Sequence, residues 1–175
     1  MGEMHVGRRT IGTSHTDRPY YPDDGLTKGD VIGYYHRIAE WLLPHVADRP
    51  MVMHRFPEGI DGGDFYHKDV PGHFPGWIDT VEIAKQEGGS LRQVVCNDTA
   101  TLIYIVNQGC LVPHVWPGRR DRLRHPDRLI FDLDPPDGDL APVVDAARAL
   151  KRLLDGVGLA PFLMSTGSRG LHVVA

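Results

Sequence analysis

Apolar residues recur at helical spacing near the start of the chain, and this pattern predicts a helix. The recurring positions are Val31, Tyr34, Tyr35, Ile38 and Leu42. Thr27 is suited to the N-cap of this helix, and Asp30, three residues later, completes a capping box. Pro44 is expected to end the helix, because proline removes a backbone donor and clashes with the preceding turn.

Two further stretches predict helices by the same spacing. The shorter covers residues 101–107 and is capped by Asn97 or Asp98. The longer covers residues 142–155 and begins after Asp139. Its apolar face is expected to carry Val143, Ala146, Ala147, Leu150, Leu153 and Leu154.

Between the helices, short apolar runs bounded by Gly, Pro and Asp predict strands. These runs are residues 50–56, 80–84, 111–116, 129–134, 161–165 and 171–175. Strands interspersed with helices indicate an α/β (α+β) fold, with a mixed central sheet flanked by helices. The last run ends the chain without a turn or tail, so we expect a cut within this strand and not a natural terminus.

Composition narrows the class of protein only slightly. A chain of 175 residues, 41% hydrophobic, fits one domain with its own core. The formal net charge of −4 gives no support for nucleic-acid binding by bulk charge, so such a partner requires local basic patches. The two cysteines form no CxxC pair, which favours neither a disulfide framework nor a zinc site. We see no signal peptide and no membrane-spanning run, so we expect a cytoplasmic, nucleoid-associated protein without a membrane partner.

A pair of carboxylates lies in the run RLIFDLDPP. Asp132 and Asp134 are two residues apart on a predicted strand, so their side chains share one face, while Phe131 and Leu133 point into the core. Carboxylate oxygens suit Mg²⁺ or Mn²⁺, and phosphoryl-transfer sites hold these ions with one or two carboxylates. The alternative is a pair of solvated aspartates; the apolar flanks, which indicate a central strand, argue against it.

A glycine-containing loop, STGSRGLH, follows later in the chain. Its glycines permit close backbone approach, and its amides and hydroxyl groups suit an anion. Arg169 adds a charge suited to phosphate. The candidate nucleotide ligands are Ser165, Thr166, Ser168, Arg169 and His172. The alternative, a tight hairpin with incidental polar residues, fits the loop equally well.

Basic and aromatic residues also cluster. Five arginines occur between residues 119 and 128, either as a surface for DNA phosphates or as a solvated loop. Phe65 and Tyr66, followed by Lys68, are candidates for stacking against bases, with ordinary core aromatics as the alternative. Because neighbours on a strand face opposite ways, we expect at least one of the two aromatics to be exposed.

Taken in order, five motifs resemble the polymerase domain of bacterial ligase D, a member of the archaeo-eukaryotic primase superfamily that acts in non-homologous end joining. They are DGLTKGDVIGYY, HRFPEGI with FYHKD, PHVWPG, RLIFDLDPPDGD and STGSRGLHVVA. The resemblance spans nearly the whole chain. It implies a DNA-end-binding part over about residues 1–110 and the start of a catalytic part over about residues 111–175.

The resemblance also implies roles for individual residues. Asp132 and Asp134 match two of three metal-binding carboxylates, usually for Mn²⁺ or Mg²⁺. His114, Thr166, Arg169 and His172 match contacts to the incoming NTP or dNTP, and His54 and Arg55 lie in a segment that approaches its triphosphate. Arg18 and Lys28 match residues that hold the 5′-phosphate of a DNA end, and Phe65 and Tyr66 match an aromatic pair near the template.

Two functions remain open on these grounds. The first is template-directed nucleotidyl transfer at DNA ends, with a ligase module and a Ku-type end-binding protein as further partners. The second is a catalytically incomplete fragment that binds 5′-phosphorylated DNA ends, because the family's third metal carboxylate lies downstream of the glycine loop. A metal-dependent nuclease uses similar carboxylates but leaves the other motifs unexplained.

Overall fold

The computed structural model describes residues 2–135, 138–167 and 169–175. The chain divides into two compact units, residues 1–123 (unit 1) and residues 124–175 (unit 2). The division falls after the strand at Cys110–Val115, because this strand pairs with one near the middle of unit 1. Each unit is described by itself.

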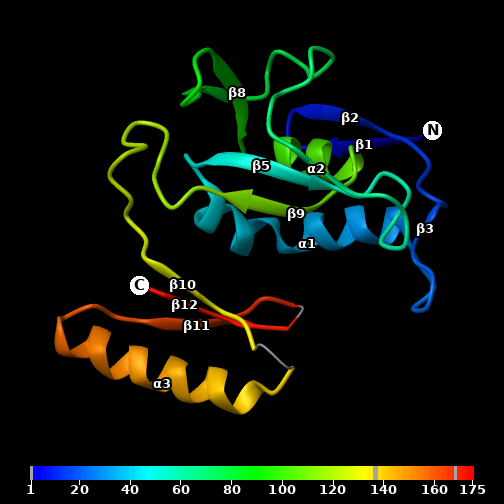
Figure 1. Ribbon diagram of the computed structural model, residues 1–175. Helices are drawn as coiled ribbons and strands as arrows, with labels where there is room; N and C mark the ends of the chain where they lie inside the picture. The colour runs from blue at the N-terminus through cyan, green and yellow to red at the C-terminus, as the bar shows by residue number, and fades with distance from the viewer. Residues whose placement is uncertain (1, 136–137, 168) are drawn as a thin grey trace. The chain divides into compact units, whose positions relative to one another are not determined.

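Unit 1 combines a five-stranded antiparallel sheet, two short hairpins and two helices (Figure 1). Its strands are β1 (Gly2–Val6), β2 (Arg9–Thr13), β3 (Pro19–Tyr21), β4 (Leu26–Thr27), β5 (Pro50–Arg55), β6 (Phe65–His67), β7 (Thr80–Ala84), β8 (Ser90–Val95) and β9 (Cys110–Val115). Its helices are α1 (Lys28–Val46) and α2 (Thr99–Asn107). β5 is the central strand. β9 pairs along one side of β5, β6 and β8 pair along different parts of its other side, and β7 pairs with β8.

Local sequence signals set the helix starts. The Thr27 side chain accepts the Asp30 N–H, and the Asp30 carboxylate accepts the Thr27 N–H, so the expected capping box is confirmed. Asp98 caps α2. The expected end of the first helix at Pro44 is wrong, because α1 continues to Val46. A proline in the last turn removes only one backbone bond, and its fixed φ is compatible with the helix.

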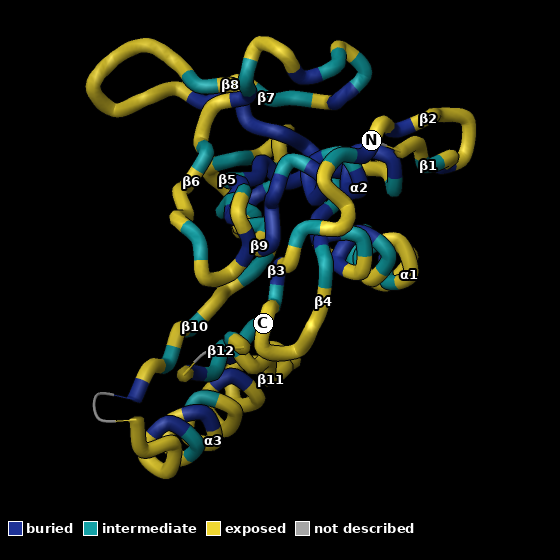
Figure 2. Tube along the Cα trace, turned by 90° about the vertical axis from the view of Figure 1, so that its right-hand side faces the viewer, coloured by how far each residue is buried: buried dark blue, intermediate teal, exposed yellow. Residues whose placement is uncertain are grey.

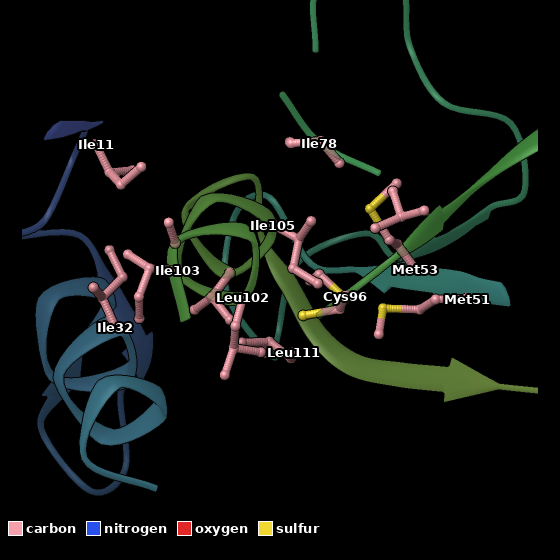
Figure 3. Close-up of a cluster of buried hydrophobic side chains, with 14 of the residues drawn as sticks. Ile11, Ile32, Met51, Met53, Ile78, Cys96, Leu102, Ile103, Ile105 and Leu111 are labelled. Atoms are coloured by element: carbon pink, nitrogen blue, oxygen red, sulfur yellow. The ribbon is translucent and has the colours of Figure 1, made fainter. Parts of the chain in front are cut away.

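The core of unit 1 lies between its sheet and its helices. It contains 22 buried residues from the hairpin β1–β2, both helices and the central strands. In Figure 3, Ile103 of α2 lies beside Ile32 of α1, while Cys96 lies near Met51 of β5. Cys96 and Cys110 are both buried and free, in line with the expectation of no disulfide framework.

Unit 2 is smaller and less well packed. It contains β10 (Ile130–Leu133), α3 (Leu140–Gly156), β11 (Phe162–Ser165) and β12 (Leu171–Val174), in an antiparallel sheet of order β10-β12-β11. Among its described residues, the core cluster contains three buried side chains, Ala147, Leu154 and Val173, and Val143 of α3 is buried outside that cluster. Figure 2 shows buried positions gathered around α2, β5 and β9, and many exposed positions along α3.

Two expectations for unit 2 need correction. β10 is an edge strand among the described residues, not a central one, since its only partner there is β12. Ala146 and Leu153 of α3 are exposed, because the buried stripe runs through Val143, Ala147 and Leu154. The α+β class is confirmed, but every strand pairing in the described part of the chain is antiparallel, and the strands form several sheets.

Candidate active site and DNA-end site

Asp132 lies on the exposed face of β10, and Asp134 follows one residue after the strand ends at Leu133. Phe131 and Leu133 pack against the core of unit 2, so Asp132 points the opposite way, and both Asp132 and Asp134 are exposed. The expected orientation of Asp132 is therefore confirmed, whereas the strand ends before Asp134 and not after it as expected. Exposed carboxylate oxygens on one face are the donors that Mg²⁺ and Mn²⁺ prefer.

His172 joins Asp132 across the sheet. The two residues are directly opposite each other in the pairing of β10 with β12, and His172 Nε2 lies 3.1 Å from Asp132 Oδ1. This contact fixes one oxygen of a carboxylate whose side chain is otherwise 65% exposed. The structure thus brings together two residues that the sequence separates by forty positions.

The glycine loop is the hairpin turn between β11 and β12, the arrangement that the sequence left open. The Thr166 N–H donates to the Gly170 carbonyl at 3.1 Å, and the Thr166 hydroxyl accepts from the Gly170 N–H at 3.1 Å. Gly167 has a φ of +77°. Ser165 and Arg169 are exposed, whereas Ser168 lies outside the described residues.

Gly170 connects this loop to the carboxylates. A Cβ built on Gly170 would overlap the Asp134 carboxylate and would lie 2.6 Å from the Leu133 carbonyl. Real Cβ atoms do not approach so closely, so only glycine allows the hairpin to close against Asp134. The loop and the carboxylate pair are therefore one packed arrangement within unit 2.

In unit 1, His54 and His114 lie on the same face of the sheet. His54 stacks on Tyr66, with ring centroids 4.2 Å apart, and lies 5.8 Å from the His114 ring. His54 Nε2 also lies 2.5 Å from Asp64 Oδ2, a partner that the sequence analysis missed because it belongs to a turn. Burial, and then the nearby His54, lower the pKa of His114, so its ring is neutral at neutral pH.

Arg55 faces the other side of β5 from His54. Its Nε donates to the Gln108 carbonyl at 2.7 Å, and its terminal nitrogen lies 2.9 Å from His67 Nδ1. Its guanidinium lies 5.3 Å from the centre of the Phe65 ring. The sequence analysis grouped Arg55 with His54, but strand alternation separates them.

Arg55 belongs instead with Lys28 and Arg18, and these three residues form the cation cluster. Lys28 is only 5% exposed, and its Nζ donates to the Ser14 carbonyl at 2.9 Å. Burial, followed by the charges of Arg18 and Arg55, lowers the pKa of Lys28 from 10.5 to about 8. Three cations that repel one another without a bound anion are suited to a highly charged one, such as a phosphate.

Arg18 is held at the rim of this cluster. It donates to the Pro57 carbonyl at 2.7 Å and pairs with Glu58 at 2.6 Å. Burial, and then Arg55, lower the pKa of His67, so this ring stays neutral beside the cations. His67 was not among the residues predicted from the sequence. Its position two residues after Phe65 places both side chains on the same face of the strand, which could have indicated that it belongs to this cluster.

Phe65 and Tyr66 are both exposed, which confirms that at least one of them avoids the core. They point to opposite faces of β6, since Phe65 pairs with Arg55 and Tyr66 with His54. Lys68 is exposed just beyond β6.

Part of the arginine-rich loop is tied internally. Arg120 pairs with Asp48 at 3.2 Å and Asp79 at 3.4 Å. This residue stabilises unit 1 and is less available to DNA than the sequence suggested.

The described residues contain no group of three or more His, Cys, Asp or Glu side chains placed to hold a metal ion. The same part of the chain has no helix that is long and apolar enough to cross a membrane.

Comparisons with known proteins identify the family of this chain. Residues 27–175 match the family described as LigD, primase-polymerase domain. The multifunctional non-homologous end joining DNA repair protein LigD of Mycobacterium tuberculosis is 36% identical over 183 aligned residues, which cover 99% of this chain and 24% of that protein. The bifunctional non-homologous end joining protein LigD of Bacillus subtilis is 32% identical over 158 residues, covering 90% of this chain and 25% of the relative.

A solved structure is also similar. The polymerase domain of Mycobacterium tuberculosis ligase D in complex with DNA matches with a TM-score of 0.86 and 32% identity, over 94% of this chain and 60% of that one. The chain belongs to the LigD primase-polymerase domain family. It spans about a quarter of the length of the curated relatives.

Proposed function

We propose that this chain contributes to template-directed nucleotidyl transfer at DNA ends during non-homologous end joining. In this reaction a primer 3′-OH attacks the α-phosphate of an NTP or dNTP, and pyrophosphate leaves. Family membership supports the reaction class. The observation that carries the assignment is the exposed carboxylate pair at the end of β10, where the glycine hairpin packs against Asp134.

Asp132 and Asp134 would hold the Mn²⁺ or Mg²⁺ ions, since their oxygens fit these hard cations. A bound divalent ion would neutralise charge that develops on the reacting phosphates. His172 orients Asp132 through the contact at 3.1 Å. Ser165, Thr166 and Arg169 are proposed ligands of the nucleotide phosphates, because the hairpin that carries them packs against Asp134 through Gly170. Ser168, which lies outside the described residues, is proposed as a further ligand from the sequence motif alone.

For the nucleotide sugar, we propose a contact from His114. Its neutral imidazole can donate to or accept from a ribose hydroxyl without the cost of burying a charge. His54 is the proposed triphosphate contact on the same face. His54 Nε2 lies 2.5 Å from Asp64 Oδ2, a contact that holds the ring on this face.

For the DNA end, we propose that the cation cluster binds the 5′-phosphate. Arg18 and Lys28 were expected from the resemblance, and the geometry adds Arg55. Phe65 and Tyr66 are the proposed contacts for template bases, and Lys68 for the backbone. A ligase module, a Ku-type protein and action at the nucleoid belong to the same proposal.

Primer extension with Mn²⁺ and ribonucleotides tests the catalytic part. We expect weak or absent extension by the 175-residue chain, because the family's third carboxylate is not among its residues. Any extension should be lost in Asp132→Ala and kept in Asp145→Ala, which removes an exposed carboxylate from α3. Robust extension that Asp132→Ala abolishes would reject the expected dependence on a third carboxylate.

The second candidate, end binding without catalysis, is favoured by one observation: the cation cluster lies wholly within well-packed unit 1. Its test is the affinity for recessed duplexes that carry a 5′-phosphate or a 5′-hydroxyl. Lys28→Ala should weaken binding of the 5′-phosphorylated end more than of the 5′-hydroxyl end. Lys151→Ala, which removes an exposed cation from α3, is the control. Equal losses for both DNA ends in Lys28→Ala would reject the assigned role.

A further inference from the structure

The last turn of α2 contains a buried polar residue that the proposed function does not yet use. Asn107 is only 5% exposed and lies at the end of a helix whose other buried residues are mostly apolar. A buried amide is costly unless its hydrogen bonds are made. An apolar residue would pack there without that cost, so the amide is expected to have a specific role.

Asn107 makes two hydrogen bonds to the backbone at the end of β2, one to Gly12 within the strand and one to Ser14 just after it. Its Oδ1 accepts the Ser14 N–H at 3.1 Å, and its Nδ2 donates to the Gly12 carbonyl at 3.1 Å. The two bonds hold the backbone between Gly12 and Ser14 against the end of α2. They hold the peptide bond that precedes Ser14, and the carbonyl of Ser14 itself accepts the hydrogen bond from Lys28 Nζ at 2.9 Å.

The segment from Ser14 to Arg18 is held in a conformation that it would not adopt alone. His15 has a φ of +52°, which is costly for a residue with a Cβ. At the far end of the segment, the Lys28 N–H donates to the Arg18 carbonyl and the Gly29 N–H to the Thr16 carbonyl, both at 2.8 Å. Asn107 thus anchors one end of the loop and the start of α1 anchors the other.

The next residue of α2 holds another cation. The Gln108 carbonyl accepts from Arg55 Nε at 2.7 Å, and carbonyl groups at a helix C-terminus favour positive charge. Two consecutive residues therefore position Lys28 and Arg55. Gly109, with a φ of +87°, then turns the chain into β9, where its backbone lies against Phe56.

We propose that Asn107 is a positioning residue of the DNA-end site, which aims Lys28 at the 5′-phosphate by clamping the loop that carries the lysine's hydrogen-bond acceptor. The inference rests on the proposed binding of a 5′-phosphate by the cation cluster. Asn107 itself touches no DNA. Its loss should lower the selectivity for the phosphate, not only the stability of the fold.

The test compares affinities for a recessed duplex with a 5′-phosphate and the same duplex with a 5′-hydroxyl, at one salt concentration. We expect Asn107→Ala to lower the ratio of the two affinities by about fivefold. Asn107→Asp has nearly the same shape and keeps the acceptor for Ser14, so it should lower the ratio by only about threefold. Gln93→Ala is the matched control, since Gln93 is also buried, at 3% exposed, but lies on β8.

A purely structural role predicts a different result. Asn107→Ala would then lower the melting temperature and leave the affinity ratio within about twofold of the wild type, and this outcome would overturn the inference. If the alanine variant does not fold, the aspartate variant decides by the same criterion. Lys28→Ala separates the two proposals: an unchanged ratio there rejects 5′-phosphate recognition by the cluster, whereas a collapsed ratio with normal Asn107 variants rejects only the role of Asn107.

Discussion

The two units of this chain differ sharply in how much apolar surface they bury. Unit 1 has a core of 22 buried residues, and its cations are fixed by backbone carbonyls of that unit. Unit 2 has three buried core residues and leaves Phe162, Leu163 and Met164 of β11 between 50% and 73% exposed. The proposed end-recognition site therefore lies on a self-supporting scaffold, whereas the carboxylates lie on a weakly packed one.

This difference indicates how the two activities depend on the rest of the protein. Recognition of a 5′-phosphate needs only residues that unit 1 itself positions. Catalytic carboxylates must be held within a fraction of an ångström, and a small sheet with exposed apolar strands cannot supply that rigidity alone. Binding should thus persist under conditions that abolish any catalytic geometry.

Separating the units gives the largest expected effect. Residues 1–123 alone should unfold cooperatively on heating and keep the preference for a 5′-phosphate, because their core is contained within that range. Residues 124–175 alone should show no cooperative transition, because a segment of this size with three buried core residues cannot offset its conformational entropy. Circular dichroism during heating measures both. A cooperative transition in residues 124–175 would remove the contrast between the units.

The glycine hairpin offers a sharper test within unit 2. Gly170→Ala should destabilise unit 2 by about 2–4 kcal/mol, since the added Cβ meets the Asp134 carboxylate and the Leu133 carbonyl. Gly167→Ala should cost about 1 kcal/mol, because that position has open space and only its φ of +77° opposes a side chain. Amide hydrogen exchange across β10 and β12 reports the difference. Equal effects of the two substitutions would show that the close approach to Asp134 is relaxed in solution.

Local signals in the sequence predicted much of this fold. The capping box at Thr27, the strand at residues 80–84 and the exposed direction of Asp132 depend only on neighbouring residues, and all three were confirmed. Pro44 was misjudged because the cost of a proline depends on its distance from the helix end, which no local pattern gives.

Most of the missed features depend on pairing between distant segments. The edge position of β10 follows from its partner β12, and the contact of His172 with Asp132 follows from their register. Strand alternation alone places Arg55 and His54 on opposite faces of β5, and this separation could be predicted from the sequence. The role of Asn107 required three segments in space, so no pattern in the sequence could reveal it.

A smaller effect is expected when the pH is raised: the preference of unit 1 for a 5′-phosphate should fall, whereas the contribution of Lys28 to its folding stability should rise. The pKa of Lys28 is about 8 in the fold against 10.5 in a free chain. Binding of a 5′-phosphate requires charged Lys28, so the preference for the phosphorylated end should fall about tenfold from pH 7 to pH 9. Between pH 8 and 10.5 the unfolded chain binds more protons than the folded one, so the Lys28 contribution to stability rises with pH across that window.

Titration of end binding and of chemical unfolding in the wild type and in Lys28→Met checks both signs. The methionine variant should lack both trends, because its side chain is neutral throughout. A preference for the phosphorylated end that stays constant from pH 7 to pH 9 in the wild type would contradict a depressed lysine pKa.

The smallest expected effect compares equivalent caps in the two units. Thr27→Ala removes the N-cap of α1, and Asp139→Ala removes the N-cap of α3. Each substitution should lower the stability of its unit by about 1 kcal/mol. In unit 1 this loss should lower the melting temperature by a few degrees and leave the amide protection of β5 and β9 in place, because the large core remains. In unit 2 the same loss is a large share of a small local stability, so amide exchange of α3 and β12 should accelerate about fivefold while that of unit 1 is unchanged. Equal acceleration in both units would mean that they open together, and that the core of unit 1 stabilises the carboxylate-bearing sheet after all.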